Sequence, residues 1–218
     1  MSIQTQGVEY QFTLNKTIRF PNLDCKQNES WLLLGNSGSG KTTFLHLLAG
    51  ILNPTIGKIL VDGTEMQLMS SQKKDEFRGK NIGLILQTPH FLKALTLGEN
   101  MILAQQFAKI KVDKSRAKLL LSQLGLEQYW DKRTYELSQG EQQRAALARA
   151  VLHSPKVILA DEPTAALDDD NTEKTVQLLD TYAKETGATL LIVTHDQRLK
   201  EHYRNQIMIG GENEELII

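Results

Sequence analysis

The chain has 218 residues, of which 40% are hydrophobic, enough to form one large α/β domain with a sizeable core. Its 25 basic residues nearly balance its 26 acidic residues, so the overall charge gives no electrostatic case for nucleic-acid binding. Cys25 is the only cysteine, which excludes a disulfide within the chain, and the five histidines lack the spacing of metal ligands.

The N-terminal segment carries no recognisable targeting signal. MSIQTQGVEYQF lacks a basic start followed by an apolar run, so we expect no signal peptide. No apolar stretch approaches the length that spans a bilayer. If the protein serves transport, we expect it to act from outside the membrane, as a subunit.

The first third of the chain predicts several strands and one helix. Short alternating runs over residues 3–20 indicate antiparallel strands. Residues 31–34 predict a buried strand, which a glycine-rich loop follows directly. Residues 41–49 then predict a helix that Gly50 can end, and residues 58–61 predict another strand after a turn.

The middle of the chain is mostly helical in its apolar spacing. Residues 70–81 are polar and of mixed charge, and residues 82–87 predict a second buried strand. Residues 89–135 resemble a helical insertion within the α/β domain. Within it, Asp113 can cap a helix through Leu124, and Gly125 can end it.

The last third alternates helices with buried strands. Helices are predicted over residues 140–152 and 170–186, and strands over 157–160 and 189–193. Repeated units of buried strand, loop and helix imply a largely parallel sheet covered on both faces. Ligands of such sheets bind at the carboxyl ends of the strands, where the polar residues of this chain gather.

A phosphate-binding loop follows the first buried strand. Residues 35–42, GNSGSGKT, match G-x-x-x-x-G-K-[ST] in full, with a strand before and a helix after. The glycines and exposed amides suit phosphate oxygens, as does the helix N-terminus. We expect Lys41 to reach the β- and γ-phosphates, Thr42 to supply a hydroxyl to Mg²⁺, and Thr43 to donate to a phosphate. The loop residues are Gly35, Asn36, Ser37, Gly38, Ser39, Gly40, Lys41 and Thr42.

Two carboxylates end the strand predicted over residues 157–160. Asp161 emerges beside the phosphate loop, where it can hold Mg²⁺ directly or through water. Glu162 lies one residue further and can polarise the water that attacks the γ-phosphate. Alone, an apolar run that ends in Asp-Glu also fits ordinary solvated acids, but the phosphate loop upstream favours the catalytic interpretation.

The stretch LSQGEQQR, residues 137–144, admits two compatible interpretations. Ser138 and Glu141 fit a capping box at the start of a helix. A capped helix N-terminus is also an anion site, so capping does not exclude a phosphate contact. Capping explains the serine and the glutamate but not the whole run.

The chain resembles the ATP-binding cassette (ABC) ATPases along almost its whole length. GNSGSGKT resembles the family's Walker A motif and VILADEP its Walker B motif. Between them come Gln87 and LSQGE, which is similar to the signature motif; after them come residues 166–168, similar to the D-loop, and His195, similar to the switch histidine. Six elements in the family's order identify the chain as an ABC ATPase subunit.

The resemblance implies a division of roles. Gln87 would touch Mg²⁺ or the lytic water, and Ser138 and the Gly140 amide would contact the γ-phosphate bound by a partner subunit. Asp168 would organise the facing site across the dimer, and His195 would hold the γ-phosphate and position Glu162. Glu141 belongs to the same implied nucleotide-binding set. Phosphoryl transfer needs mainly positioning and charge stabilisation, which these groups supply.

Family members usually stack an aromatic side chain on adenine. Tyr10 and Phe12 are both candidates, in phase on one predicted strand, and we favour Phe12 by its position at the end of that strand. The alternative is that both aromatics are core residues.

The resemblance also implies an architecture and its parts. We expect a P-loop NTPase (RecA-like) α/β core with a mostly parallel sheet, an N-terminal antiparallel β subdomain and an inserted α-helical lobe. The predicted ranges are about 1–34 and 51–66 for the antiparallel part, 35–50, 82–87 and 155–218 for the core, and about 88–154 for the helical lobe.

The implied function is that of the ATP-hydrolysing motor subunit of a transporter. It would bind ATP and Mg²⁺, form a homodimer when ATP is bound, and sit on the cytoplasmic face of a membrane by docking a permease through residues 88–100. The run LADEPT, residues 159–164, and the compact length resemble the lipoprotein-release and macrolide-export branch. Ala165 and Ala166 stand where that branch usually has Gly-Asn, and importers and other exporters stay open.

A soluble ABC ATPase is the alternative, either of the iron–sulfur assembly type or associated with nucleic acid. One basic cluster could be cited for nucleic acid, but it lacks interleaved aromatics, and we interpret it as the solvated face of a helix, or a face toward lipid headgroups. Its members are Lys109, Lys111, Lys114, Arg116 and Lys118. No nucleic-acid partner is expected.

Overall fold

The computed structural model describes residues 2–13 and 16–210. Predictions for residues 1, 14–15 and 211–218, at the edges of the predicted β part and core, lie outside the described residues. The strands are β1 (Ile3–Thr13), β2 (Lys16–Arg19), β3 (Asp24–Cys25), β4 (Ser30–Gly35), β5 (Ile56–Val61), β6 (Thr64–Glu65), β7 (Ile82–Ile85), β8 (Val157–Asp161), β9 (Thr189–Val193) and β10 (Asn205–Ile209). The α-helices are α1 (Lys41–Leu48), α2 (Ser71–Asn81), α3 (Leu97–Phe107), α4 (Lys114–Gln123), α5 (Gln139–Val151), α6 (Asp169–Thr186) and α7 (Gln197–His202).

Two sheets of different kinds form the strand framework. The first is antiparallel, with β2, β1, β5 and β6 in that order and β3 paired to β1. The second is parallel, with the order β10-β4-β9-β8-β7. The α/β class and the mostly parallel core sheet expected from the sequence are therefore confirmed, as is an N-terminal antiparallel part. Its predicted boundary at residue 34 was wrong, because residues 30–34 belong to β4 of the parallel sheet.

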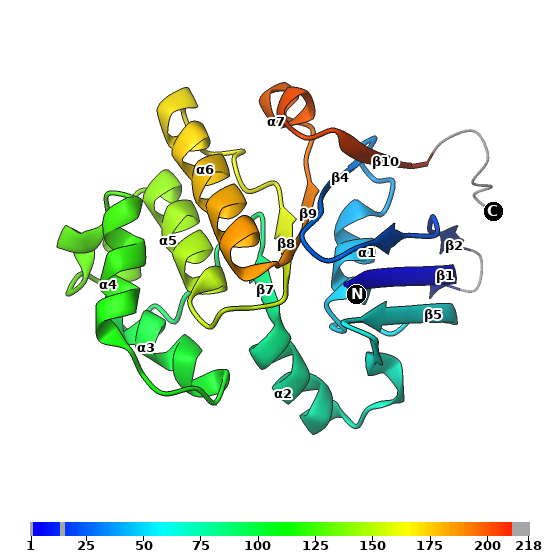
Figure 1. The fold of residues 1–218 in the computed structure, drawn as a ribbon, viewed down its shortest axis with the longest axis horizontal. Helices are drawn as coiled ribbons and strands as arrows, with labels where there is room; N and C mark the ends of the chain where they lie inside the picture. Colours follow the sequence, from blue (N-terminus) through cyan, green and yellow to red (C-terminus); the bar gives the residue numbers. More distant parts are fainter. Residues whose placement is uncertain (1, 14–15, 211–218) are drawn as a thin grey trace.

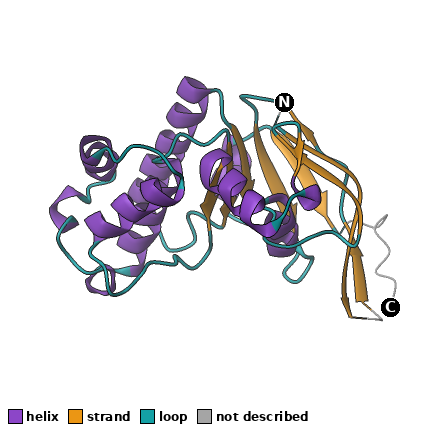
Figure 2. Ribbon diagram, turned by 90° about the horizontal axis from the view of Figure 1, so that it is seen from below, coloured by secondary structure: helices purple, strands orange, loops and turns teal. Residues whose placement is uncertain are grey.

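Side chains of the parallel sheet alternate between two hydrophobic clusters. In β8, Val157 and Leu159 join α1 and the antiparallel sheet in one cluster, whereas Ile158 and Ala160 join α5 and α6 in the other. Parallel strands that are covered by other elements on both faces are expected to be buried on both faces. Figures 1 and 2 show the helices α3 to α6 gathered on one side of the parallel sheet and the antiparallel strands on the other.

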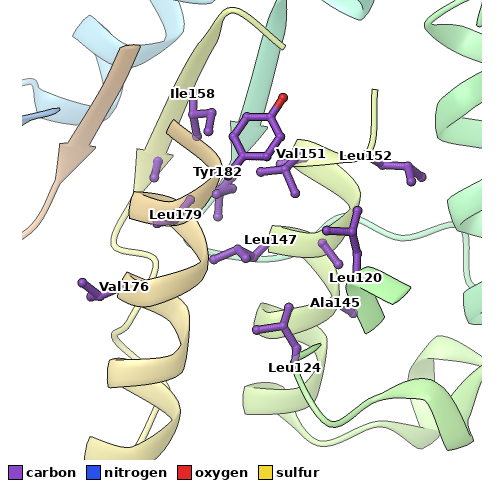
Figure 3. Packing of buried hydrophobic residues seen from close by; sticks show 14 of the residues in the cluster. Leu120, Leu124, Ala145, Leu147, Val151, Leu152, Ile158, Val176, Leu179 and Tyr182 are labelled. Carbon is purple, nitrogen blue, oxygen red and sulfur yellow. The ribbon is translucent and has the colours of Figure 1, made fainter. Parts of the chain in front are cut away.

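The helical part shares one core with the parallel sheet. Figure 3 shows Leu147 and Val151 of α5 beside Leu179 and Tyr182 of α6, with Ile158 of β8 close by. The same cluster of buried residues extends to Leu121 of α4 and Met101 of α3. The region predicted as a helical lobe is thus continuous with the sheet through α5.

Most predicted elements occur close to their expected bounds. Asp113 caps α4 by accepting a hydrogen bond from the Arg116 amide at 2.9 Å, and Gly125 follows with φ of 68°. The helix expected at residues 170–186 is α6, which begins one residue earlier and ends at Gly187 with φ of 68°. Capping and glycine signals therefore located these helix ends correctly.

Helix α2 and strand β10 have no counterpart in the sequence prediction, and neither do the short elements β3 and α7. Within α2 no residue is buried, so the segment lacks the apolar periodicity that indicates a helix. Strand β10 pairs with β4 at the edge of the parallel sheet, and Met208 in it is 57% exposed. An edge strand with exposed positions gives only a weak sequence pattern.

The interpretation of the basic cluster as one helix face was wrong in part. Lys109 and Lys111 lie in the connection between α3 and α4, outside any helix. Lys109 forms an ion pair with Glu76 at 2.7 Å, and the Arg116 guanidinium donates to the Leu152 carbonyl at 3.1 Å. Arg116 therefore stabilises the end of α5 and is not a free surface cation.

No helix within residues 2–13 and 16–210 is both long enough and apolar enough to cross a membrane.

Gly98 on α3 packs directly against the ring of Trp130. A Cβ atom at residue 98 would lie 2.3 Å from Trp130 Cε2, and the Gly98 amide already donates to the Trp130 carbonyl at 2.8 Å. We expect Gly98→Ala to lower the free energy of unfolding by roughly 1–3 kcal/mol, because steric crowding outweighs the better helix propensity of alanine. Urea denaturation measures this, with exposed Gln106→Ala on the same helix as control. An unchanged free energy of unfolding would mean that the Trp130 ring can shift to make room for the methyl group without loss of stability.

Candidate active site

Three adjacent strands of the parallel sheet end at one place. Val193 at the end of β9 is in register with Leu33 of β4 on one side and with Asp161 of β8 on the other. The phosphate loop follows β4, the acidic pair ends β8, and His195 follows β9. Because parallel strands place their carboxyl ends on one edge, these distant segments meet there.

The phosphate loop leads into α1 through a residue that only glycine fits well. Gly40 is the N-cap of α1 with φ of 94°, and a Cβ there would lie 3.1 Å from Ile18 Cδ1. The Lys41 ammonium donates to the carbonyls of Gly35 and Asn36, at 2.8 Å each. The loop therefore curls around the lysine side chain, and the amides at the start of α1 form a cradle for an anion.

Thr42 and Asp161 meet across the sheet edge. The Thr42 hydroxyl donates to Asp161 Oδ2 at 2.7 Å, although 119 residues separate them in sequence. Burial raises the pKa of the Asp161 carboxyl, and the Thr42 hydrogen bond offsets this only in part. A hydroxyl and a carboxylate held together at a buried strand end are hard oxygen donors of the kind that Mg²⁺ prefers.

The raised pKa of Asp161 has a measurable consequence for stability. The native state holds the Asp161 proton more tightly than the unfolded chain, so its ionisation costs stability as pH rises through the native pKa. We expect Asp161→Asn to raise the thermal midpoint of nucleotide-free protein at pH 8 by roughly 2–4 °C, the shift from about 1 kcal/mol in a chain of this length. The gain should shrink as pH falls toward 4, because the native carboxyl takes up its proton and no longer carries a buried charge.

Thermal melts of both proteins from pH 4 to pH 8 measure this difference. A variant that is less stable than the parent at pH 8 would show that the Thr42 contact outweighs burial. The surface carboxylate of Asp75, whose side chain is 67% exposed, supplies the control as Asp75→Asn.

Glu162 is held in an unusual conformation by β9 and its following loop. Its φ is 49°, in the left-handed region that non-glycine residues seldom adopt. The Glu162 amide donates to the Val193 carbonyl at 2.8 Å, and the His195 ring lies with Nδ1 2.7 Å from Glu162 Oε1. The Glu162 side chain is 9% exposed and that of His195 is 78% exposed. The carboxylate is thus fixed inside the site while the imidazole reaches outward.

A pocket of about 570 Å³ unites these groups. Of the predicted residues it is lined by Phe12, Gly35, Ser37, Gly38, Gly40, Lys41, Thr42, Thr43, Gln87, Asp161, Glu162 and His195. Lys16 and Ile18 of β2 line it as well, and the sequence analysis did not select them. The sequence could have indicated them through their strand, because β2 pairs with β1, which carries Phe12. Asn36 and Ser39 belong to the loop but are not among the lining residues.

Phe12 and Tyr10 occupy different positions relative to this pocket. Phe12 lines it, is 44% exposed, and has the Lys16 ammonium 5.6 Å from its ring centre. Tyr10 packs against the core beneath the antiparallel sheet and meets Phe12 edge to face at 4.9 Å. An exposed aromatic face beside the phosphate loop suits a nucleobase, and Phe12 supplies it.

The signature residues lie apart from this pocket. Ser138, Gly140, Glu141 and Asp168 are not among its lining residues in the described part of the chain. Ser138 and Glu141 form the predicted capping box, with the Glu141 amide 3.3 Å from Ser138 Oγ and the Ser138 amide 2.7 Å from Glu141 Oε2. Asp168 caps α6 by accepting from the Asn171 amide at 2.8 Å. Both motifs therefore form exposed helix starts outside the chain's own phosphate site.

A parallel sheet with a phosphate loop after one strand and an acidic pair after another defines a P-loop NTPase. Comparison with known proteins narrows the class. A family model described as ABC transporter matches residues 19–165. Two relatives from Bacillus subtilis (strain 168) are both ABC transporter ATP-binding proteins, and each is 38% identical to this chain. The uncharacterized YvcR matches over 202 residues, 89% of this chain and 78% of that protein; YxdL matches over 186 residues, 84% and 72%.

Solved structures agree with the sequence relatives. The dimeric post-hydrolysis state of the ATP-binding cassette MJ0796 bound to ADP and Pi has a TM-score of 0.90 and 30% identity, covering 99% of each chain. The cbiO1 structure from Clostridium perfringens, part of the ABC transporter complex cbiONQ, has a TM-score of 0.80 and 27% identity, covering 95% of this chain and 84% of that one. The chain belongs to the ABC transporter family, as an ATP-binding cassette that hydrolyses ATP.

Proposed function

We propose that this cassette is the motor subunit of a membrane transporter, in which ATP-driven closure of a dimer moves a separate permease. The observation that carries the proposal is the convergence of Lys41, Thr42, Asp161, Glu162 and His195 on one pocket at the sheet edge. Each has the chemistry that phosphoryl transfer requires, namely cations for phosphate oxygens, oxygen donors and a base.

The phosphate loop binds the triphosphate in this proposal, and Phe12 stacks on the adenine. Lys41 exchanges its loop carbonyls for the β- and γ-phosphates, because an anionic partner is a stronger acceptor than a neutral carbonyl. Thr42 and Asp161 fit Mg²⁺ as oxygen ligands that already touch, and Gln87 lines the same pocket. When bound, Mg²⁺ neutralises charge on the phosphates.

Hydrolysis follows from the position of Glu162. A water oxygen attacks the γ-phosphorus, the bond to the β–γ bridging oxygen breaks, and the water proton passes to the Glu162 carboxylate. With a proton on both ring nitrogens, His195 would donate from Nδ1 to Glu162 Oε1 and from Nε2 to the γ-phosphate. One side chain thereby links the phosphate to the base.

A second copy of the chain completes the site in the proposed cycle. Ser138 and Gly140 lie at the start of a capped helix and do not line the chain's own pocket. Facing another subunit, this helix start would meet the γ-phosphate held there, with Asp168 beside it. ATP then favours the closed dimer because it contacts both subunits, and hydrolysis removes those contacts.

A groove near Gln87 is the proposed docking surface for the permease. It has a volume of about 560 Å³ and is lined mainly by apolar side chains of the 84–92 segment, α3 and α5, among them Leu84, Leu92, Leu103 and Phe107. An apolar groove of this size suits a short amphipathic segment of a partner. The groove includes part of the 88–100 segment that is expected to dock a permease. It therefore lies next to Gln87, which lines the phosphate pocket. This arrangement supports a peripheral location on the inner face of a membrane.

Within transporters, the run from Leu159 to Thr164 supports the lipoprotein-release and macrolide-export branch.

Membrane association tests the transporter role itself. Leu92 is 54% exposed in the groove, and Leu119 on α4 is 58% exposed outside it. We expect the tagged chain to co-purify with membranes from cells that express its native partners. Leu92→Glu should reduce that fraction at least about tenfold, whereas Leu119→Glu should not, because a buried charge weakens an apolar contact.

The transporter role would be contradicted if the parent chain stayed in the soluble fraction. It would also be contradicted if both variants lowered the membrane-bound fraction equally. In that case the soluble ABC ATPase is the better description. Basal ATP hydrolysis by the purified variants is the internal check that both proteins are folded.

A further inference from the structure

Thr194 is a buried threonine between β9 and His195. It is 1% exposed and contacts a different carboxylate oxygen of Glu162 from the one that the histidine ring contacts. Its hydroxyl donates to Glu162 Oε2 at 3.0 Å, and the Asp196 amide donates to the same hydroxyl oxygen at 3.0 Å. Both carboxylate oxygens therefore have partners: Oε2 accepts from the Thr194 hydroxyl and, at 3.4 Å, from the His195 amide, and Oε1 meets the His195 ring.

The direction of the Thr194 hydrogen bond is fixed by its neighbours. A hydroxyl has one proton to donate, and here an amide N–H already points at its oxygen. The proton of Thr194 therefore has to point toward Glu162, which accepts it with a carboxylate oxygen. The hydroxyl is buried, and its contacts within residues 2–13 and 16–210 are with Glu162 and the Asp196 amide.

A second pair joins the same two loops. The Thr164 hydroxyl, also 1% exposed, donates to Asp196 Oδ2 at 2.8 Å. Asp196 in turn caps α7 by accepting from the Arg198 amide at 3.0 Å. The loop after β8 and the loop after β9 are thus linked by two side-chain hydrogen bonds, one at Glu162 and one at Thr164.

We propose that Thr194 is a positioning residue for hydrolysis, which holds the Glu162 carboxylate in the orientation that receives the water proton. This inference rests on the proposed role of Glu162 as base. The last torsion of a glutamate side chain is broad and roughly two-fold, so an untethered carboxylate rotates freely. Thr194 holds Oε2, which leaves Oε1 on the side of His195 and the pocket.

Thr194→Val removes the hydroxyl and keeps the shape. We expect kcat for ATP hydrolysis to fall about 10- to 100-fold, the range expected for a lost hydrogen bond to a charged group, while KM for MgATP stays within about twofold. ATP-dependent dimer formation, measured by size-exclusion chromatography, should persist. Thr194→Ser, which keeps the hydroxyl, should restore most of kcat. A merely structural role would instead lower stability and raise KM.

Thr175→Val is the matched control. Thr175 is fully buried on α6, and its hydroxyl has no hydrogen-bond partner among the described residues, so the substitution should leave kcat and stability unchanged. If Thr194→Val yields aggregated protein, Thr194→Ala takes its place in the series.

A double-mutant cycle with Glu162→Gln separates this inference from the proposed base. Because Thr194 acts through Glu162, adding Thr194→Val to Glu162→Gln should change the single-turnover rate by less than about twofold. An equal loss in both backgrounds overturns the positioning role. Wild-type hydrolysis by Thr194→Val, with Glu162→Gln inactive, overturns the positioning role and leaves the base standing. Wild-type hydrolysis by Glu162→Gln overturns both.

Discussion

Glu162→Gln is expected to slow ATP hydrolysis by at least about 100-fold while ATP binding is retained, since general bases contribute roughly this factor or more. Glutamine keeps the size of the side chain and still accepts from Thr194, but it cannot take a proton from water. Thr42, Lys41 and the loop amides, which would bind the nucleotide, do not contact the substituted group in the structure.

The variant should therefore accumulate as an ATP-bound dimer. Dimer opening requires hydrolysis, so blocking the chemical step leaves the closed state as the end point. Size-exclusion chromatography with ATP measures the dimer, and phosphate release measures hydrolysis. Glu173→Gln, on the exposed surface of α6, is the control. Normal phosphate release from Glu162→Gln would show that another group activates the water.

Ser138→Arg is expected to leave ATP binding by the isolated subunit intact and to prevent both closed-dimer formation and hydrolysis. Ser138 is exposed at the start of α5 and does not line the pocket of its own chain. A long side chain there would occupy the space that the partner's γ-phosphate needs. Fluorescent-nucleotide binding should change less than about threefold, because the subunit's own phosphate loop is untouched.

A second substitution distinguishes phosphate contact from helix capping. Aspartate caps helices as well as serine does, so Ser138→Asp should preserve the helix start. Its negative charge would nevertheless repel a phosphate across the dimer. We expect Ser138→Asp to be as stable as the parent but to fail in dimer formation. If Ser138→Asp and Ser138→Arg both hydrolyse ATP normally, the stretch serves only as a capped helix.

The sequence located the pocket well because its chemistry sits in short local patterns. The phosphate loop, the acidic pair and His195 each follow an apolar strand, and parallel strands bring their ends together whatever their order. The capping box at Ser138 is equally local. These signals need no knowledge of long-range packing.

What the sequence did not predict depends on packing between distant segments. Glu162 has a left-handed backbone and contacts segments far along the chain: its amide donates to Val193 of β9, and its carboxylate accepts from Thr194, 32 residues away. Thr194 itself looks like an ordinary strand residue until its neighbours are known. Helix α2 was missed because it buries no side chain, and β10 because its pattern is that of an exposed edge. Neither leaves a periodic apolar pattern to detect.

The position of β9 between β4 and β8 also affects when the site can exist during synthesis. Strand β9, at the centre of the parallel sheet, is followed along the chain by only one other described strand, β10, so it leaves the ribosome late. It pairs with β4, which is made much earlier, as the pair Ser30 and Leu190 shows. Contacts of such long sequence separation close slowly. A nascent chain that already displays the phosphate loop and the acidic pair would therefore lack the strand that joins them. Nucleotide binding should then appear only after the last part of the domain has emerged.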